Sequence, residues 1–388
     1  MEFYLRKDLN FIAKWWLDID KVNLFLIISL MLFGILMTVT SSTYIAQKIG
    51  VSKFYFIKKQ IFFTTLALLI LITISFLNTN LIKICAILGI FSIILLLIAV
   101  LVFGSEAKGA KRWLSIFGFS LQPSEFSKTF FIIFNAYLLD KFYQKKWYLK
   151  YSSSLLLFAV IISLLIAQPD FGMSLLLTLI WLSQLFLYGL PLMLITLILL
   201  ITVVGSIYAY IKLPHVTDRI NRFLDKSSEN YQVEKSMDAF SNGGFFGQGP
   251  GEGVVKKHIP DAHTDFIFAV IVEEFGMIGA IVILAIIFTI ISRVIFKNLK
   301  QNDLFIYLAL SGLVIQFAFQ SLINIGVSMA LLPTKGMTLP FISYGGSSIL
   351  ATAFAFGVIL ALTKKDHGYH LNEKRVMIGN FNRLFRRP

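Results

Sequence analysis

The sequence is poor in charge and in cysteine, and it lacks any long polar stretch. Only 14% of its 388 residues are Asp, Glu, Lys or Arg, whereas 57% are hydrophobic. Cys85 is the only cysteine, which excludes an intrachain disulfide. No polar stretch is long enough to fold alone, so separate soluble domains are excluded and one integral membrane domain is expected. No removable signal peptide is evident, because residues 1–20 mix charges with aromatics and the first apolar run is long enough to span.

Positive charge is in excess, with 35 Lys and Arg against 21 Asp and Glu and a net charge of +14. In a soluble protein this excess would suggest nucleic acid. Here the cations are scattered through loops between apolar runs. Anionic lipid headgroups, or an anionic lipid-linked substrate, are therefore the better partners, and no nucleic acid is expected.

Apolar runs of about 20 residues, the length that crosses a bilayer as a helix, recur along the chain. Ten candidates lie at 22–42, 60–77, 82–103, 125–140, 153–167, 172–189, 191–211, 264–292, 303–325 and 347–363. They predict an all-α polytopic membrane protein with ten transmembrane helices within residues 22–363. An N-terminal segment, 1–21, precedes this domain and a basic tail, 364–388, follows it. An even number of spans places both termini on one side.

The Lys and Arg residues favour cytoplasmic termini only slightly, with 19 on inner segments and 16 on outer ones. An anionic substrate bound at the outer face would explain the outer cations. Four outer loops are rich in glycine, proline and polar residues, whereas the inner loops are plain: 104–128, 168–172, 212–263 and 326–347. The concentration of glycine, proline and polar residues in the loops of one side predicts a single active or binding face.

Asp265 is the candidate catalytic residue. It lies in KKHIPDAHTDFIFAVIVEEFG, residues 256–276, where a polar loop becomes an apolar helix. A helix N-terminus favours the ionised carboxylate, so Asp265 would be available as a base, although it could instead only cap the helix. Glu274 lies about 13 Å further along a continuous helix and on its opposite face. Glu273 and Glu274 are therefore expected to pair elsewhere or to shape the helix.

A second set of candidates lies in the loop 104–128. Arg112 could bind a phosphate through two hydrogen bonds, and Trp113 could stack on a sugar or lie at the membrane interface. Glu125 and Lys128 are three residues apart at the start of a membrane segment, so they can pair. Ionisable groups that enter a membrane give a functional role a modest advantage over an anchor and a helix cap.

Two further loops combine glycine with polar residues. Residues 242–253 contain six glycines, so their backbone amides could converge on an anion, with Lys256 and Lys257 adding charge; a flexible loop is the alternative. In the segment 332–348, prolines and glycines break any helix, and Lys335 is the only charge. This segment is expected to be re-entrant or to line a cavity.

Several polar residues have structural roles as the first expectation. Asp170 lies in a short turn between two helices, where a Pro-Asp turn suffices. Gln316, Gln320 and Asn324 recur every four residues along one helix face, and hydrogen bonds between helices are their expected role, with cavity lining second. His258 and His263 lack partners at metal-binding spacing, so no metal site is expected.

Four motifs occur in an order that resembles the SEDS family of cell-wall polymerases. They are GAKRWLSIFGFSLQPSEFSK, AQPDFG, GQGPGEGVVKKHIPDAHTDFIFAVIVEEFG and LLPTKGMTLPFISYGGSS. The resemblance runs from about residue 20 to residue 365. AQPDFG, the LLPTKG segment and the GPGEG loop resemble the division branch of the family more than its elongation branch.

The resemblance implies a ten-helix SEDS-type fold with cytoplasmic termini in the bacterial inner membrane, at the division septum. It also implies polymerisation of lipid II into glycan chains by an inverting glycosyltransferase, with Asp265 as the essential acid. The substrate-binding candidates are residues of the matched motifs: Arg112, Trp113, Glu125, Lys128, Lys256, Lys257, His263, Lys335 and Ser343. A divalent cation, magnesium or manganese, near the pyrophosphate is left open.

The implied partners are lipid II, the lipid-linked nascent glycan, a class B penicillin-binding transpeptidase and other membrane proteins of the division machinery. Three alternatives to a division polymerase stay open. A lipid II flippase would also need polar residues inside a many-helix protein, although no internal repeat supports a transporter. A polymerase of the elongation branch or a non-catalytic scaffold would share the motifs.

Overall fold

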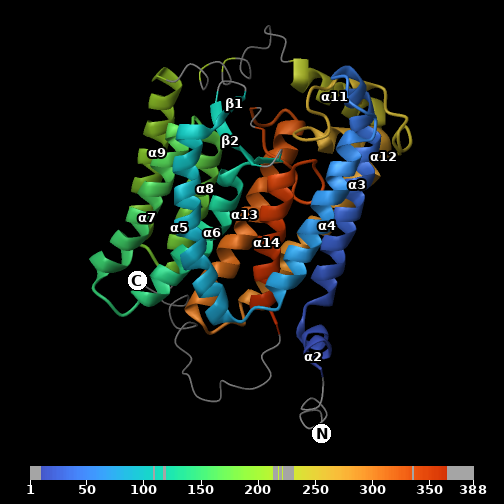
Figure 1. Ribbon diagram of the computed structural model, residues 1–388. Helices are drawn as coiled ribbons and strands as arrows, with labels where there is room; N and C mark the ends of the chain where they lie inside the picture. Colours follow the sequence, from blue (N-terminus) through green and yellow to red (C-terminus); the bar gives the residue numbers. More distant parts are fainter. Residues whose placement is uncertain are drawn as a thin grey trace, which may run out of the picture.

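The computed structural model describes residues 10–107, 110–116, 119–212, 217, 221, 231–333 and 336–364. A bundle of long helices makes up most of this part of the chain (Figure 1). Its ten long helices are α3 (Lys21–Lys48), α4 (Tyr55–Ser75), α5 (Thr79–Phe103), α6 (Pro123–Lys141), α7 (Trp147–Ala167), α8 (Phe171–Tyr188), α9 (Leu192–Lys212), α12 (Ile267–Asn298), α13 (Leu304–Ser328) and α14 (Gly346–Leu362). Each of the ten predicted segments coincides with one of these helices and extends beyond its ends by at most three residues.

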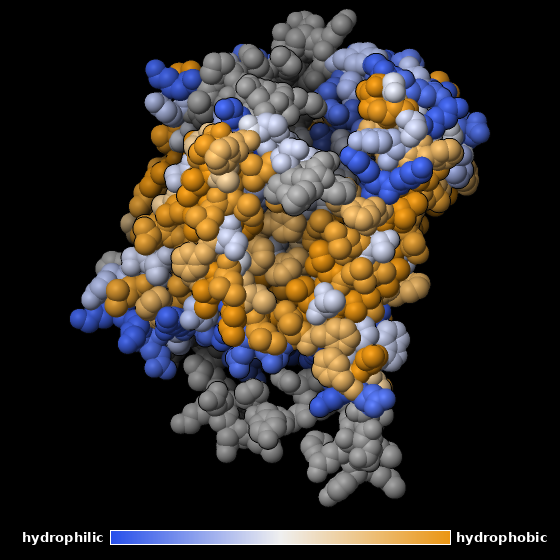
Figure 2. Space-filling model, in the orientation of Figure 1, coloured by the Kyte–Doolittle hydropathy of each residue, from blue (hydrophilic) through white to orange (hydrophobic). Residues whose placement is uncertain are grey.

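The bundle has the surface of a multi-pass membrane protein. Eight of the described helices are long and apolar enough to cross a bilayer, and α14 is a shorter apolar helix. The tenth helix, α6, is more polar and largely buried. Hydrophobic residues cover the middle of the face shown in Figure 2, and hydrophilic residues gather toward both ends. The apolar belt matches the hydrocarbon layer that such helices span.

Local sequence signals set many of the helix ends. The carboxylates of Asp20, Asp170 and Asp303 each accept a backbone amide at the start of α3, α8 and α13. Pro123 occupies the first turn of α6. Gly189 ends α8 with φ 98°, the left-handed conformation that glycine adopts without a side-chain clash. The chain turns here and continues as α9 from Leu192.

One end of the bundle, which we call the strand end, carries structure that the sequence did not predict (Figure 1). Three short antiparallel strands, β1 (Ser105–Ala107), β2 (Ala110–Ile116) and β3 (Phe119–Leu121), form a sheet of order β1-β2-β3. The loop 212–263 contains α11 (Tyr231–Gly243) and a short 3₁₀ helix, η1 (Val255–His258). The predicted helical membrane fold is confirmed, and these short elements add to it at this end.

Helix α12 is interrupted, which corrects the prediction of a continuous helix over 264–292. Gly276 has φ 66° and ψ −168°, outside the helical region. The main chain of the loop after α11 fills the break, since the Met277 amide donates to the Gly244 carbonyl at 3.0 Å. A Cβ on Gly276 would lie 2.3 Å from the Phe245 carbonyl oxygen, so only glycine fits here.

The segment that leads into α14 is buried without being helical. Leu339, Phe341 and Ile342 are each at most 2% exposed. Gly34 of α3 permits this packing, because a Cβ there would lie 2.4 Å from the Phe341 carbonyl oxygen. Irregular backbone inside the bundle is the arrangement predicted for residues 332–348, and its polar groups are bonded to neighbouring helices as described below.

An ion cluster closes the opposite end, where α2 (Phe11–Asp18) lies. The Asp20 carboxylate, 1% exposed, is 2.8 Å from Arg293 and 2.9 Å from Lys297. Burial alone would raise the pKa of Asp20, but hydrogen bonds from Lys297 and Arg293 hold it below its ordinary value. The cluster ties the start of α3 to the end of α12.

Candidate active site

Asp265 lies at the strand end, in the turns just before α12. Its amide donates to the Asp261 carbonyl at 3.1 Å, and its own carbonyl accepts a 2.9 Å hydrogen bond from the Asn324 side chain of α13. The carboxylate oxygen Oδ2 is 3.5 Å from the position that a Cβ on Gly336 would occupy. The carboxylate therefore faces the segment that begins at Gly336, and the side chain is half-buried.

Residues 336–345, which we call the inner segment, hold the backbone around Asp265. The Ser343 hydroxyl donates to the Thr264 carbonyl at 2.6 Å and accepts the Leu339 amide at 2.8 Å. The Tyr344 amide donates to the His263 carbonyl at 2.9 Å. Ser343 is 3% exposed. Ser343 and Tyr344 therefore hold the backbone of Thr264 and His263, the two residues that precede Asp265.

Aromatic rings pack around His263. Its ring centroid is 4.8 Å from that of Phe56 on α4 and 5.3 Å from that of Tyr344. Burial, with a smaller contribution from Tyr55, raises the pKa of Tyr344 to about 12, so its hydroxyl stays protonated at neutral pH. The His263 ring therefore packs between Phe56 and Tyr344, two residues before the candidate base.

Glu125 and Lys128 form the pair that their spacing predicted. Lys128 Nζ lies 2.9 Å from Glu125 Oε2 and 2.9 Å from Gln320 Oε1, and Lys128 is 1% exposed. Gln320 in turn donates to the Thr338 carbonyl at 3.2 Å. The buried pair is thus connected to the inner segment.

Two residues of the α13 stripe bring the candidates together. Gln320 links Lys128 to Thr338, and Asn324, one turn later, donates to the main chain of both Asp265 and Met337. The expected hydrogen bonds between helices are confirmed for Gln320, which meets Lys128 of α6, whereas Asn324 donates to main chain outside the helices. The sequence did not predict what they would bind, because their partners are distant along the chain.

Arg112 on β2 lies beside the turn between α7 and α8. Its guanidinium donates to the Pro169 carbonyl and lies 3.7 Å from Asp170 Oδ1. The Ser124 hydroxyl donates to Asp170 Oδ2 at 3.4 Å, which connects this cluster to the start of α6. Asp170 therefore does more than form a turn. Trp113 follows on β2 opposite Ser105 and is half-buried.

The other lysine candidates lie in different surroundings. Lys256 is 5% exposed; its ammonium donates to the Gly251 carbonyl at 2.9 Å and pairs with the Glu274 carboxylate. Lys257 is exposed. Lys335 lies outside the described residues. Roles for these lysines toward a substrate stay predictions.

The glycine-rich loop is hydrogen-bonded to α12. Its Gln248 and Gly249 amides donate to the Glu273 and Glu274 carbonyls, each at 2.9 Å. The Val255 and Lys256 amides, just beyond the glycines, donate to the Glu273 carboxylate at 2.7 and 2.8 Å. The anion on which these amides converge therefore belongs to the protein itself.

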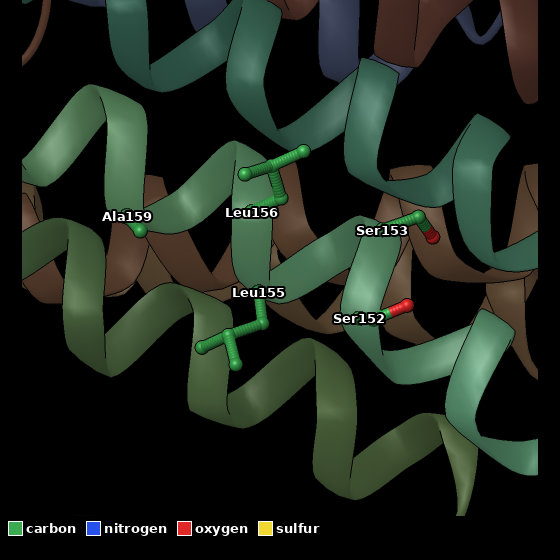
Figure 3. Close-up of a pocket in the computed structure, with 5 residues that line it drawn as sticks. All are labelled: Ser152, Ser153, Leu155, Leu156 and Ala159. Atoms are coloured by element: carbon green, nitrogen blue, oxygen red, sulfur yellow. The ribbon is translucent and has the colours of Figure 1, made fainter.

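Surface hollows lie elsewhere in the molecule. One of about 450 Å³ is lined by residues of α7 alone, and Figure 3 shows them along that helix: Ser152, Ser153, Leu155, Leu156 and Ala159. Another of about 370 Å³ lies between α8, α9 and α13. Neither is lined by a candidate residue. Within the described ranges, no three His, Cys, Asp or Glu residues are grouped so that they could hold a metal ion.

Comparisons with known proteins agree with the motifs. The profile of the FtsW/RodA/SpoVE family, described as cell cycle protein, matches residues 21–368. A probable peptidoglycan glycosyltransferase FtsW of Caulobacter vibrioides is 36% identical over 367 residues, which cover 94% of each chain. Another from Trichlorobacter lovleyi is 35% identical and covers 89% of this chain and 93% of its own.

Solved structures share the fold. A chain in a peptidoglycan synthase complex, reported for the structural coordination of polymerization and crosslinking, superposes with a TM-score of 0.75 at 26% identity. It covers 90% of this chain and 98% of its own. The rod shape determining protein RodA of Thermus thermophilus superposes with a TM-score of 0.68 at 25% identity, over 90% and 97% of the two chains. The resemblance to SEDS proteins is confirmed, and this chain belongs to the FtsW/RodA/SpoVE family.

Proposed function

We propose that the chain is a peptidoglycan glycosyltransferase that polymerises lipid II into glycan chains at the outer face of the cytoplasmic membrane during cell division. The observation that carries the proposal is the placement of Asp265. Hydrogen bonds from α13 to its carbonyl and from the inner segment to the carbonyl of Thr264 hold it at the strand end of the bundle. The names of the curated relatives support the reaction, and they favour the division role over the elongation role.

Asp265 is the general base in the proposed mechanism. It removes the proton from the 4-hydroxyl of the N-acetylglucosamine of incoming lipid II. The oxygen attacks the anomeric carbon of the growing chain, the new glycosidic bond forms with inversion, and the bond to the lipid pyrophosphate breaks. The pyrophosphate leaves with the bonding electrons, and the proton stays on Asp265 until it is released to water.

Cations near the strand end would offset the charge that develops on the leaving pyrophosphate. The Arg112 side chain is 19% exposed, and Lys257 is exposed. Lys128 is bonded to Glu125 and Gln320. Its charge would therefore act on the pyrophosphate from a distance, across the inner segment. A magnesium or manganese ion would need ligands from the substrate phosphates and water, the usual arrangement for magnesium, because the described side chains form no carboxylate cage.

The test that separates this enzyme from a flippase uses purified protein in detergent, where no membrane separates two compartments. With lipid II and its partner transpeptidase present, we expect glycan chains that are resolved by gel electrophoresis. Synthesis that disappears with Asp265→Asn would exclude a contaminating polymerase. A protein that makes no glycan under any condition, yet moves lipid II across vesicle membranes, would favour the flippase.

The strand end faces the outside of the cell in this proposal, and both termini are cytoplasmic. We expect a cysteine at Glu252, in a Cys85→Ser background, to react with an impermeant thiol reagent added to intact cells. A cysteine at Gln144, in the exposed turn between α6 and α7, is expected to react only after the cells are opened. The reverse pattern of labelling would overturn the orientation.

The proposed partner is a class B penicillin-binding transpeptidase, which would crosslink the glycan at the septum with other division proteins. The peptidoglycan synthase complex reported for the coordination of polymerization and crosslinking contains a chain with this fold, which supports the proposed partnership. The loop 212–263 at the strand end is the proposed contact, because α11 and η1 carry it across the bundle end close to Asp265. Arg219 and Arg222, which belong to this loop, lie outside the described residues.

A further inference from the structure

The buried carboxylate of Glu273 is the centre of a set of contacts that the proposed reaction does not use. Its side chain is 0% exposed. It accepts hydrogen bonds from the Val255 amide at 2.7 Å, the Lys256 amide at 2.8 Å and the Asn242 side chain at 3.1 Å. Gly253 lies directly against it, since a Cβ there would be 2.8 Å from the carboxyl carbon. Three donors from the loop therefore surround one carboxylate of the helix.

The break in α12 makes this arrangement possible. Because the helix is interrupted at Gly276, the carbonyls of Glu273 and Glu274 are available to the Gln248 and Gly249 amides of the loop. The neighbouring Glu274 carboxylate pairs with the Lys256 ammonium. The loop is thus bound to the helix through main chain, through a hydrogen-bonded carboxylate and through an ion pair.

These contacts close a loop of the chain that contains Asp265. The Lys256 amide and the Glu273 carboxylate that it meets belong to residues 17 positions apart in sequence, and Asp265 lies between them. Ile259, which is 2% exposed, and Ala262, which is 0% exposed, pack inside the closed segment. On its other side the segment is held by Asn324 and Ser343. Two attachments from different directions therefore determine where Asp265 lies.

We propose that Glu273 is a positioning residue for Asp265, an inference that rests on the proposed role of Asp265 as base. By holding Val255 and Lys256 against the first half of α12, Glu273 fixes the loop end of the segment 255–265. Asn324 and Ser343 fix its other side. The glutamate takes no part in the chemistry, and it acts only through the place that it gives to the base.

Glu273→Gln is the most direct test, because it keeps the shape but changes the hydrogen bonding. The carboxylate offers two acceptor oxygens to three donors, whereas the amide offers one and turns an NH₂ group toward a backbone N–H. One donor then loses its partner and the segment loosens. Since a misplacement of about 1 Å can cost about a hundredfold in rate, we expect kcat to fall by roughly ten- to a hundredfold with KM for lipid II unchanged.

The experiment uses the full chain in complex with its transpeptidase, with lipid II as substrate. Polymerisation gives kcat and KM, and hydrogen–deuterium exchange with mass spectrometry reports on the backbone. We expect exchange to rise within residues 255–265 in Glu273→Gln and to stay unchanged in α13 and α14. Glu252→Gln is the matched control, because it makes the same change at an exposed position of the same loop. It is expected to behave as the wild type.

Asn242→Ala keeps the inference testable if Glu273→Gln does not fold. It removes a single donor to the same carboxylate from a side chain at the end of α11 and is expected to lower kcat several-fold with the same local rise in exchange. Wild-type kcat in a folded Glu273→Gln protein, or a fall in kcat without the local rise, would overturn the inference. A wild type that makes no glycan would overturn the proposed function instead, and the exchange difference would still decide whether Glu273 holds the segment.

Discussion

Replacing Asp265 by asparagine is expected to abolish glycan synthesis while the protein inserts and folds normally. Asparagine keeps the size of the side chain and can still form hydrogen bonds, but it cannot take a proton from the acceptor hydroxyl. Loss of a general base costs about 10²–10⁴-fold in rate, which places the variant below detection in a gel assay. The measurement is polymerisation of lipid II by the purified complex, together with size-exclusion chromatography to confirm that the protein is intact.

Asp303→Asn is the control for this variant. Asp303 also lies at the start of a helix, where its carboxylate accepts the Ile306 amide at 2.9 Å, and asparagine caps a helix about as well. Because Asp303 is distant from the strand end, its replacement should not affect the reaction, and we expect wild-type activity in Asp303→Asn. Full activity in Asp265→Asn would eliminate Asp265 as the base, and equal losses in both variants would point to a general effect of the substitution.

The second large effect is expected at Lys128. Replacing it by methionine leaves the Glu125 carboxylate buried without its cation, and breaking a buried ion pair in this way costs about 3–5 kcal/mol of folding free energy. Replacing both members, as in Glu125→Gln with Lys128→Met, removes the buried charge and should restore most of that stability. Thermal unfolding in detergent, read by fluorescence, measures both variants.

Activity separates a structural role from a catalytic one. If Lys128 offsets charge on the leaving pyrophosphate, the stable double variant should remain inactive. Recovery of activity together with stability would show that the pair only supports the fold. Lys235→Met serves as the control, because Lys235 and Asp238 form a pair with the same spacing on the surface of α11, where solvent screens the charges. We expect little change in stability or activity in Lys235→Met.

Helix positions and local pairs followed from the sequence because both depend on neighbours along the chain. The apolar runs predicted ten helices, and the three-residue spacing of Glu125 and Lys128 predicted their pairing. The clustering of polar loops on one side predicted that the candidates would gather at one end of the bundle. Asp265 was singled out for the same local reason, a carboxylate at the boundary between a polar loop and an apolar helix.

Contacts between distant residues did not follow from the sequence. Lys128 meets Gln320 at a separation of 192 residues, and the Ser343 hydroxyl meets the Thr264 carbonyl at a separation of 79. The strands β1 to β3 were also missed, because short strands between helices carry weak periodicity. The break at Gly276 was missed because a glycine within an apolar run does not by itself predict a kink.

The sequence by itself determined that this chain is a helical membrane protein with one chemically distinct end, and its motifs placed it in its family. Hydrophobic periodicity and helix spacing carry that information, because they act over a few residues. The tertiary structure alone decided which anion the loop amides hold and what keeps Asp265 in place. The glycines of 242–253 allowed converging amides, but only the packing of the loop against the interrupted α12 made Glu273 the anion that neighbouring amides bind.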